Sequence, residues 1–100
     1  MKISEYTLNH LAKAVCGDFV YMPYIKGYEL VLFFNKYGFN DTYEQGFPSR
    51  WKYTEDKLRT LNGKDTIRQI IEEVVDPRRF HGLEITVENA VSQINDFLKY

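Results

Sequence analysis

Apolar residues recur at helical spacing in five stretches of this sequence, and glycine or proline follows four of them. In the last stretch Ala90, Ile94 and Phe97 fall on one face, which makes it the clearest stripe in the chain. Glycine ends a helix readily because it lacks the Cβ that strains a left-handed residue. This pattern predicts a mainly α protein, a compact five-helix domain.

Capping residues indicate where these helices begin and end. Polar side chains that can accept from free helical N–H groups precede four stretches, at Ser4, Ser49, Asp65 and Thr86. The predicted ends are Gly17, Gly38, Gly63 and Asp76, the last because a residue before proline avoids the helical region. The second helix is predicted over residues 28–37. Residues 19–26 and 80–85 leave room for one short β pair, although Pro23 favours a loop.

The apolar faces of the predicted helices define the expected core. In the third helix Trp51, Leu58 and Leu61 repeat at helical spacing, so we expect the tryptophan to be enclosed. The side chains predicted to be largely buried are Trp51, Leu58, Ile70, Val74, Ile94 and Phe97. An aromatic-rich loop connects the second and third helices, and it holds further rings that need a place to pack.

Length and composition limit the class of protein. One hundred residues make one helical domain, and the helical pattern that runs to Tyr100 leaves open that it is the N-terminal part of a longer protein. The single cysteine, Cys16, excludes an internal disulfide and is typical of the cytoplasm. No apolar run approaches the roughly 20 residues of a membrane span, so we expect no membrane partner. A net charge of -1 argues against bulk attraction to nucleic acid.

The residues that usually carry catalysis or bind metals are poorly placed for either. His10, His81 and Cys16 show none of the spacings that metal sites use. Cys16 and His10 lie six positions apart in one predicted helix and point in different directions, so they form no nucleophile and base. We therefore predict no catalytic residue, no metal site, no cofactor and no enzyme activity.

A basic segment between Arg50 and Arg68 is a candidate for contact with nucleic acid. It holds six cations against three acids, and the outline of helix, short turn and helix is that of a helix-turn-helix. The candidate contacts are Arg50, Tyr53, Lys57, Lys64 and Arg68. Cations could bind phosphates while the tyrosine stacks on a base. The alternative is an ordinary solvated helix face, which lysine and arginine form in most proteins.

Aromatic side chains in and after the loop form a second candidate. Phe39, Tyr43, Phe47, Arg50 and Trp51 combine aromatic rings with arginine, the residue types that anchor protein interfaces. One interpretation is a small satellite core beneath a long loop. The other is a binding surface for another protein or for another domain of the same chain.

The most distinctive motif overlaps this segment and reads FNDTY-x-x-GFPSRWKYTE-x-K-x-x-x-LNG. Together with VVDPRRF and the closing ENAVSQINDFLKY, it resembles the small N-terminal domain of AbiJ-type bacterial abortive-infection proteins, which act in phage defence. The resemblance covers most of the chain from about Gly17 onward. It implies an accessory or sensing domain joined to a separate effector, often a nuclease-like or ATPase-like module, and it supplies no set of catalytic residues.

These observations lead to one preferred function and one alternative. We expect a non-enzymatic recognition domain of a bacterial antiviral defence protein, which acts by protein–protein or interdomain contact with an effector module of the same or a neighbouring chain. The alternative is a nucleic-acid-binding helical domain that uses the basic face between Arg50 and Arg68.

Overall fold

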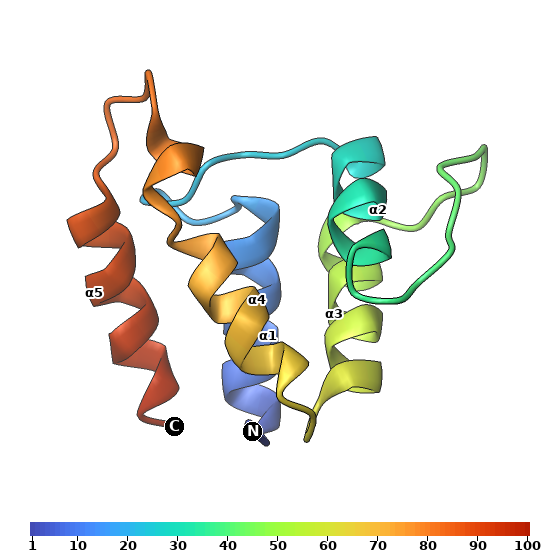
Figure 1. Cartoon of the computed structure of the whole chain (residues 1–100), viewed down its shortest axis with the longest axis horizontal. Helices are drawn as coiled ribbons and strands as arrows, with labels where there is room; N and C mark the ends of the chain where they lie inside the picture. Colours follow the sequence, from blue (N-terminus) through green and yellow to red (C-terminus); the bar gives the residue numbers. More distant parts are fainter.

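The computed structural model describes all 100 residues and confirms a mainly α fold (Figure 1). The α-helices are α1 (Glu5–Cys16), α2 (Gly27–Asn35), α3 (Arg50–Leu61), α4 (Thr66–Val74) and α5 (Val87–Leu98), and a short 3-10 helix, η1, spans Pro77–Phe80. None of the helices combines the length and the apolar character that crossing a bilayer requires. The chain contains no β-strand, so the short β pair does not form.

Local hydrogen bonds explain why the two loops form no β pair. The N–H of Ile25 donates to the carbonyl of Cys16 at 3.2 Å, which ties residues 19–26 to the end of α1 rather than to a second strand. Pro23 has no N–H to give to a sheet. In the other segment, residues 80–85, Phe80 is the last residue of η1, and the N–H of Leu83 donates to its carbonyl at 3.1 Å. Both segments therefore make local backbone hydrogen bonds, and neither forms a strand.

The capping predictions are confirmed at some helices and wrong at others. Ser4 Oγ accepts from the N–H of Thr7 at 3.1 Å, and Thr86 Oγ1 accepts from the N–H of Asn89 at 3.3 Å. Ser49 and Asp65 precede α3 and α4 but make no side-chain cap. The Asp65 carboxylate instead accepts from Arg68 at 2.7 Å, because the two side chains lie three positions apart on one helix face.

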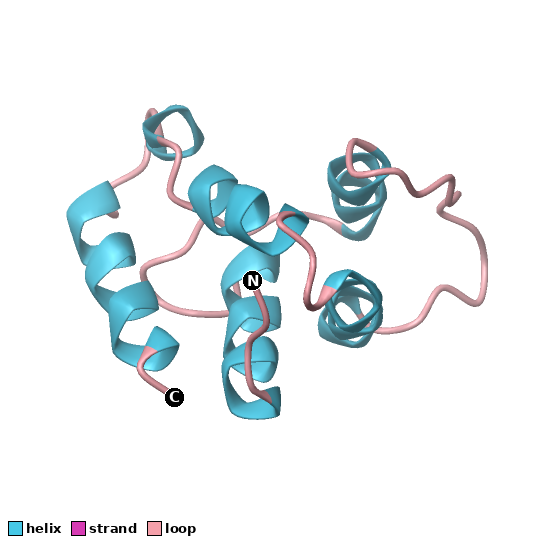
Figure 2. Ribbon diagram, turned by 60° about the horizontal axis from the view of Figure 1, so that its bottom comes forward, coloured by secondary structure: helices cyan, strands magenta, loops and turns pink.

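The first helix forms the centre of the domain. It packs against α3, α4 and α5, and α2 packs on α3 at the outer side of the bundle (Figures 1 and 2). Its apolar stripe, Leu8, Leu11 and Val15, is fully buried. The long connection between α2 and α3 extends away from the helices at this outer side (Figure 2). The core therefore lies around α1, while the loop sits at the edge.

Burial is confirmed for five of the six side chains predicted to form the core, Leu58, Ile70, Val74, Ile94 and Phe97. The prediction for Trp51 is wrong, because 44% of this residue is exposed, whereas Tyr53 is only 6% exposed. The reason is that α3 packs on two sides, against α1 and against α2. Tyr53 points toward α2, and its ring lies 5.9 Å from that of Phe34. Trp51 lies in the first turn of α3, where Arg50 makes the contact with the end of α1.

Candidate functional site

Arg50, a candidate in both predictions, is committed to the fold. Its Nε donates to the carbonyl of Ile25 at 2.9 Å, and its Nη2 donates to the carbonyl of Cys16. Its Nη1 lies 3.0 Å from the carboxylate of Asp18. The guanidinium carbon also lies 3.9 Å from the centre of the Tyr24 ring. Arg50 therefore joins α3 to the end of α1 and to the loop that follows it, and its donors are largely occupied.

Lys57 and Tyr53 are likewise occupied, by the loop between α2 and α3. Lys57 Nζ lies 2.7 Å from Asp41 Oδ2, and the hydroxyl of Tyr53 donates to the same oxygen at 2.8 Å. The two donors lower the pKa of Asp41, with Lys57 contributing most. Lys57 Nζ also lies 4.6 Å from the centre of the Phe39 ring. These contacts fasten the loop onto α3 and leave little of either side chain for a phosphate.

The basic face between Arg50 and Arg68 is neutralised by acids of the same chain. Arg68 pairs with Asp65 and with Glu72 at 2.7 and 2.6 Å. The remaining pairs in this segment are Lys52 with Asp56 and Arg59 with Glu5 and Asp56. Lys64 is the one cation of the six without an ion pair. The electrostatic attraction that nucleic-acid binding depends on is therefore small on this face.

The predicted aromatic group divides into a packed part and an exposed part. Phe47 lies 4.7 Å from the Tyr53 ring, and Phe39 lies 6.2 Å from the Phe34 ring, so both form a satellite of the core beneath the loop. Tyr43 is 54% exposed, although its ring rests on Phe47 at 4.7 Å and on the backbone of Gly27. Trp51 remains exposed, and no aromatic ring stacks on it.

A group of rings that the sequence analysis did not single out lies between α1 and α5. Tyr6 and His10 stack with centroids 4.1 Å apart, and the Tyr6 ring lies 5.0 Å from that of Tyr100. The Phe97 ring lies 5.7 Å from His10 and 6.2 Å from Phe19. We call Tyr6, His10, Phe19, Phe97 and Tyr100 the aromatic cage. The spacing of four between Tyr6 and His10 in α1 was visible in the sequence, but their meeting with Phe97 and Tyr100 was not.

The aromatic cage borders a pocket of about 400 Å³ that also has polar walls, from Gln93, Asp96 and Lys99. The amide oxygen of Gln93 is buried and has no hydrogen-bond partner. The Asp96 carboxylate lies 3.9 Å from Lys99 Nζ, with both side chains more than two thirds exposed. Such an exposed and distant pair contributes little. The pocket therefore holds one carboxylate and one ammonium in a weak pair, and one buried amide oxygen without a partner.

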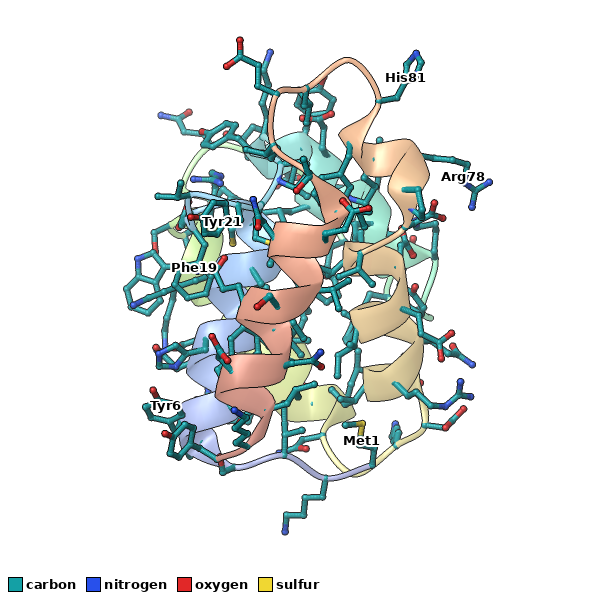
Figure 3. All side chains as sticks on the ribbon, turned by 90° about the vertical axis from the view of Figure 1, so that its left-hand side faces the viewer. Met1, Tyr6, Phe19, Tyr21, Arg78 and His81 are labelled. Atoms are coloured by element: carbon teal, nitrogen blue, oxygen red, sulfur yellow. The ribbon has the colours of Figure 1, made fainter.

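Exposed apolar side chains continue from the cage along the loop after α1. Val20 is 80% exposed and Tyr24 is 63% exposed. Tyr6, Phe19 and Tyr21 lie along the same edge of the molecule, whereas Arg78 and His81 lie toward another corner (Figure 3). We call Val20, Tyr21 and Tyr24, together with the aromatic cage, the aromatic surface. Trp51 is linked to it through Arg50, its neighbour in α3, which stacks on Tyr24.

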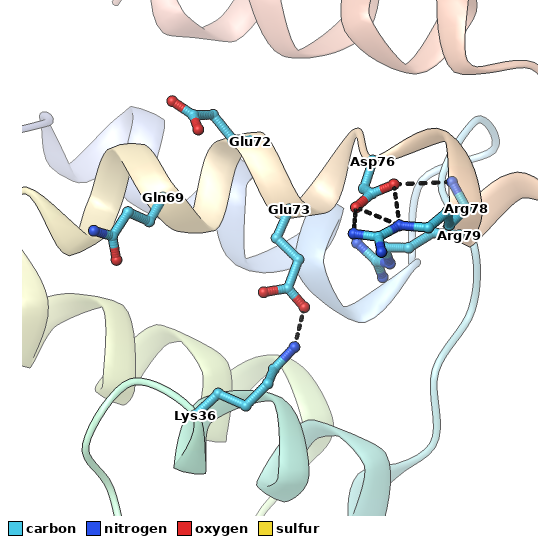
Figure 4. A pocket seen from close by; sticks show the side chains of 7 residues that line it. All are labelled: Lys36, Gln69, Glu72, Glu73, Asp76, Arg78 and Arg79. Carbon is cyan, nitrogen blue, oxygen red and sulfur yellow. Dashed lines mark hydrogen bonds and ion pairs between the residues drawn. The ribbon is translucent and has the colours of Figure 1, made fainter.

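A second pocket, of about 520 Å³, lies between α2, α4 and η1 and has no hydrophobic residue in its lining (Figure 4). Its lining comprises Lys36, Gln69, Glu72, Glu73, Asp76, Arg78 and Arg79. Glu73 pairs with Lys36 and accepts from the hydroxyl of Tyr37, and Asp76 pairs with Arg78 at 2.6 Å. The acids of this polar pocket are therefore balanced by cations. No free pair of carboxylates is available for acid–base chemistry.

Two groups at the polar pocket have shifted protonation equilibria. Burial and the carboxylate of Glu73 raise the pKa of Tyr37 well above its ordinary value, so its hydroxyl stays protonated and donates. Burial lowers the pKa of Arg79, whose Nη1 donates to the carbonyl of Val74 at 3.2 Å and whose Nη2 is buried without a partner. Arginine stays charged at any ordinary pH, so neither shift creates a general base.

No family model, curated protein or solved structure matches this chain. The molecule also brings together no group of three or more metal-ligating side chains. The geometry of the aromatic surface and of the two pockets is therefore the basis for assigning a function.

Proposed function

We propose that this chain is a non-enzymatic recognition domain that binds another protein, or another domain of its own chain, through the aromatic surface. The observation that carries the proposal is the contrast between two surfaces. The cations between Arg50 and Arg68 are almost all paired within the chain, whereas Val20, Tyr21 and Tyr24 leave much of their apolar area exposed to solvent. Exposed apolar patches of this kind mark interaction sites in soluble proteins.

The residue types of the aromatic surface support a protein partner. Tyrosine, tryptophan and arginine are the residues that most often carry binding energy at interfaces, and the two aromatic types bury a large area at a modest cost in entropy. Tyr24 is held in place by the guanidinium of Arg50, so a partner meets a ring that is already ordered. Trp51 adds a further exposed ring beside that arginine.

The state of the reactive groups supports the non-enzymatic part of the proposal. Cys16 is fully buried, and burial raises the pKa of its thiol to about 11, so almost none of it is thiolate near neutral pH. The carboxylates of Glu73 and Asp76 are paired with cations. A nucleophile, a base and an orienting group do not meet at one place, and catalysis of group transfer needs such a meeting.

The biological setting is proposed from the resemblance to AbiJ-type domains. In that setting the partner is an effector module of the same or a neighbouring chain, in a bacterial antiviral (abortive infection) system, and the domain controls or positions the effector. The nucleic-acid alternative loses support because Arg50 and Lys57 hold the fold together. The experiments described below can detect nucleic-acid binding if it occurs.

The test is photo-crosslinking in the cells that make the protein. A benzophenone amino acid replaces Tyr21 on the aromatic surface, and in a matched control it replaces Gln69 at the polar pocket. We expect a discrete crosslink to a polypeptide from position 21 and none from position 69. The captured protein, once purified, should bind the Tyr21→Ser variant roughly tenfold more weakly than the unaltered chain. Equal crosslinking from both positions, or a crosslink to nucleic acid alone, would overturn the proposal.

A further inference from the structure

Hydrogen bonds from Asn62 and Gly63 hold the segment that precedes α1. These two residues lie in the turn between α3 and α4, beside residues 1–3 (Figure 1). Asn62 Oδ1 accepts from the N–H of Ile3 at 2.9 Å, and Asn62 Nδ2 donates to the carbonyl of Ile3 at 2.9 Å. The backbone N–H of Gly63 donates to the carbonyl of Met1 at 3.1 Å. We call these three hydrogen bonds the Asn62 clasp.

Asn62 and Gly63 are also the only asparagine–glycine pair in the chain. Such a pair is prone to spontaneous deamidation, because glycine has no Cβ to hinder the approach of its backbone nitrogen to the side-chain amide. We propose that Asn62 is a deamidation site that the Asn62 clasp keeps closed. We further propose that conversion of the amide to an acid prevents the clasp from forming again.

The reaction needs only water and the atoms of this turn. The backbone nitrogen of Gly63 gives up its proton and attacks Cγ of Asn62. The new C–N bond closes a succinimide ring while the bond between Cγ and Nδ2 breaks, and Nδ2 leaves with that proton as ammonia. Water then opens the ring at one carbonyl or the other. The products are aspartate, or isoaspartate with a longer backbone, and no oxidation or reduction takes place.

The folded chain occupies both groups that must react. The N–H of Gly63 donates to the carbonyl of Met1, and both ends of the Asn62 amide are held by Ile3. Gly63 itself is exposed, so water reaches the turn, and the protection comes from the hydrogen bonds rather than from burial. The reaction therefore waits for residues 1–3 to detach. Local openings of this kind need less free energy than global unfolding.

The product cannot restore the clasp. A carboxylate only accepts hydrogen bonds, so its second oxygen would face the carbonyl oxygen of Ile3 where Nδ2 donated before. Isoaspartate also displaces Gly63 from the carbonyl of Met1, because it lengthens the backbone at this point. The Ile3 side chain is 8% exposed and belongs to the core. Deamidation therefore loosens a buried contact at the start of α1, and it does so irreversibly.

The first test measures how fast the full chain deamidates. Peptide mapping by mass spectrometry follows the conversion of residue 62 in the folded protein and in urea. We expect the folded protein to react at least roughly tenfold more slowly, because only the open population reacts. Ile3→Ala weakens the hold on residues 1–3. It should raise the deamidation rate and the hydrogen exchange of the Gly63 amide by the same factor.

The second test measures what the product does to stability. Asn62→Asp should raise the equilibrium constant for unfolding roughly tenfold, as urea titration measures it. Asn40→Asp makes the same chemical change at an exposed asparagine in the loop between α2 and α3 and should leave that constant nearly unchanged. Asn62→Ser removes the donor to Ile3 without adding a charge. It should cause a smaller loss, and it decides the matter if Asn62→Asp does not fold.

Three results would overturn the proposal. The first is deamidation of residue 62 at the same rate in the folded protein and in urea. The second is no conversion of residue 62 in urea. The third is an equal effect of Asn62→Asp and Asn40→Asp on unfolding.

Discussion

The guanidinium of Arg50 lies flat against the ring of Tyr24, 3.9 Å from its centre, while its nitrogens donate to the carbonyls of Ile25 and Cys16. One side chain at the start of α3 thus satisfies the end of α1 and orders the loop that carries the aromatic surface. Arg50 therefore stabilises the structure of the domain. It affects the binding of a partner only by ordering the loop that carries the aromatic surface.

Replacement of Arg50 should therefore destabilise the fold. We expect Arg50→Met to lower the free energy of unfolding by about 2 to 3 kcal/mol, because two partly buried carbonyls and the carboxylate of Asp18 lose their donor. Lys52→Met is the control, since Lys52 makes only an exposed pair with Asp56 at 3.6 Å and should cost about 0.5 kcal/mol or less. Urea titration measures both. Equal losses of unfolding free energy for the two variants would contradict a stabilising role for the Arg50 contacts.

Trp51 should report an exposed site and contribute little to stability. We expect Trp51→Ala to lower the free energy of unfolding by about 1 kcal/mol or less. Leu58→Ala, in the same helix but fully buried, should cost about 2 to 5 kcal/mol. Because Trp51 is the single tryptophan, its fluorescence in the folded protein should be readily quenched by iodide. A blue-shifted emission that resists quenching would mean that the ring is enclosed after all.

Cys16 should give the stability a distinct pH dependence. Burial raises the pKa of its thiol from 9.0 to about 11, so folding favours the protonated form. The contribution is fully present below the pKa of the unfolded thiol and is lost as the pH rises toward the folded value, by at most about 3 kcal/mol. Burial also raises the pKa of Tyr37 and of Tyr53 above the ordinary value of 10.0, so their contributions are lost in the same direction from about pH 10 upward. The difference between the wild type and Cys16→Ala therefore isolates the thiol. A difference that stays constant between pH 8 and pH 11 would contradict the assignment.

Two glycines with left-handed backbone should respond differently to alanine. A Cβ at Gly17, where φ is +80°, would lie 2.0 Å from the carbonyl oxygen of Pro23 and 2.4 Å from the Cα of Tyr24. Gly38 has φ +101° but open space around it. We expect Gly38→Ala to cost about 1 to 2 kcal/mol, the strain of the conformation alone. Gly17→Ala should cost about 3 kcal/mol or more, since the loop must also move. Thermal unfolding of the pair compares them directly.

Nucleic acid should not bind measurably at physiological ionic strength. Fluorescence anisotropy with labelled duplex and single strands over a salt series tests this, because each phosphate contact adds about 0.7 to 0.9 to the slope of log affinity against log salt. Lys64→Glu is the informative variant, since Lys64 is unpaired. Lys57→Glu would instead place a carboxylate against Asp41 and disturb the loop. Micromolar, salt-sensitive binding that Lys64→Glu abolishes would favour the nucleic-acid alternative.

Local features of the fold could be predicted from the sequence. Ser4, Gly17 and Thr86 act within a few residues of themselves, so their roles follow from residue type and position. The buried stripe of α1 follows from spacing alone. Asp65 shows the limit of this reasoning, because its carboxylate could accept either from the helix backbone or from Arg68, and the arginine prevails.

The candidate site could be predicted only in part, because it depends on which elements meet. Periodicity places Trp51 on the apolar face of α3, but it cannot show that α2 and the loop cover the opposite face and bury Tyr53. From the sequence alone Lys57 is expected to be a solvated cation. In the structure the loop between α2 and α3 places Asp41 beside it. The aromatic cage joins Tyr6 to Tyr100 across almost the whole sequence. No local pattern carries that information.

The central position of α1 has a consequence during synthesis. This helix is synthesised before α3, α4 and α5, which bury its apolar stripe, and Thr7 Oγ1 finds its acceptor only at the carbonyl of Phe97. At about 5 to 20 residues per second, Leu8, Leu11 and Val15 stay uncovered for several seconds while the rest of the chain is made. The nascent chain therefore exposes this apolar stripe through much of its synthesis, and the stripe is fully covered only after α5 has emerged.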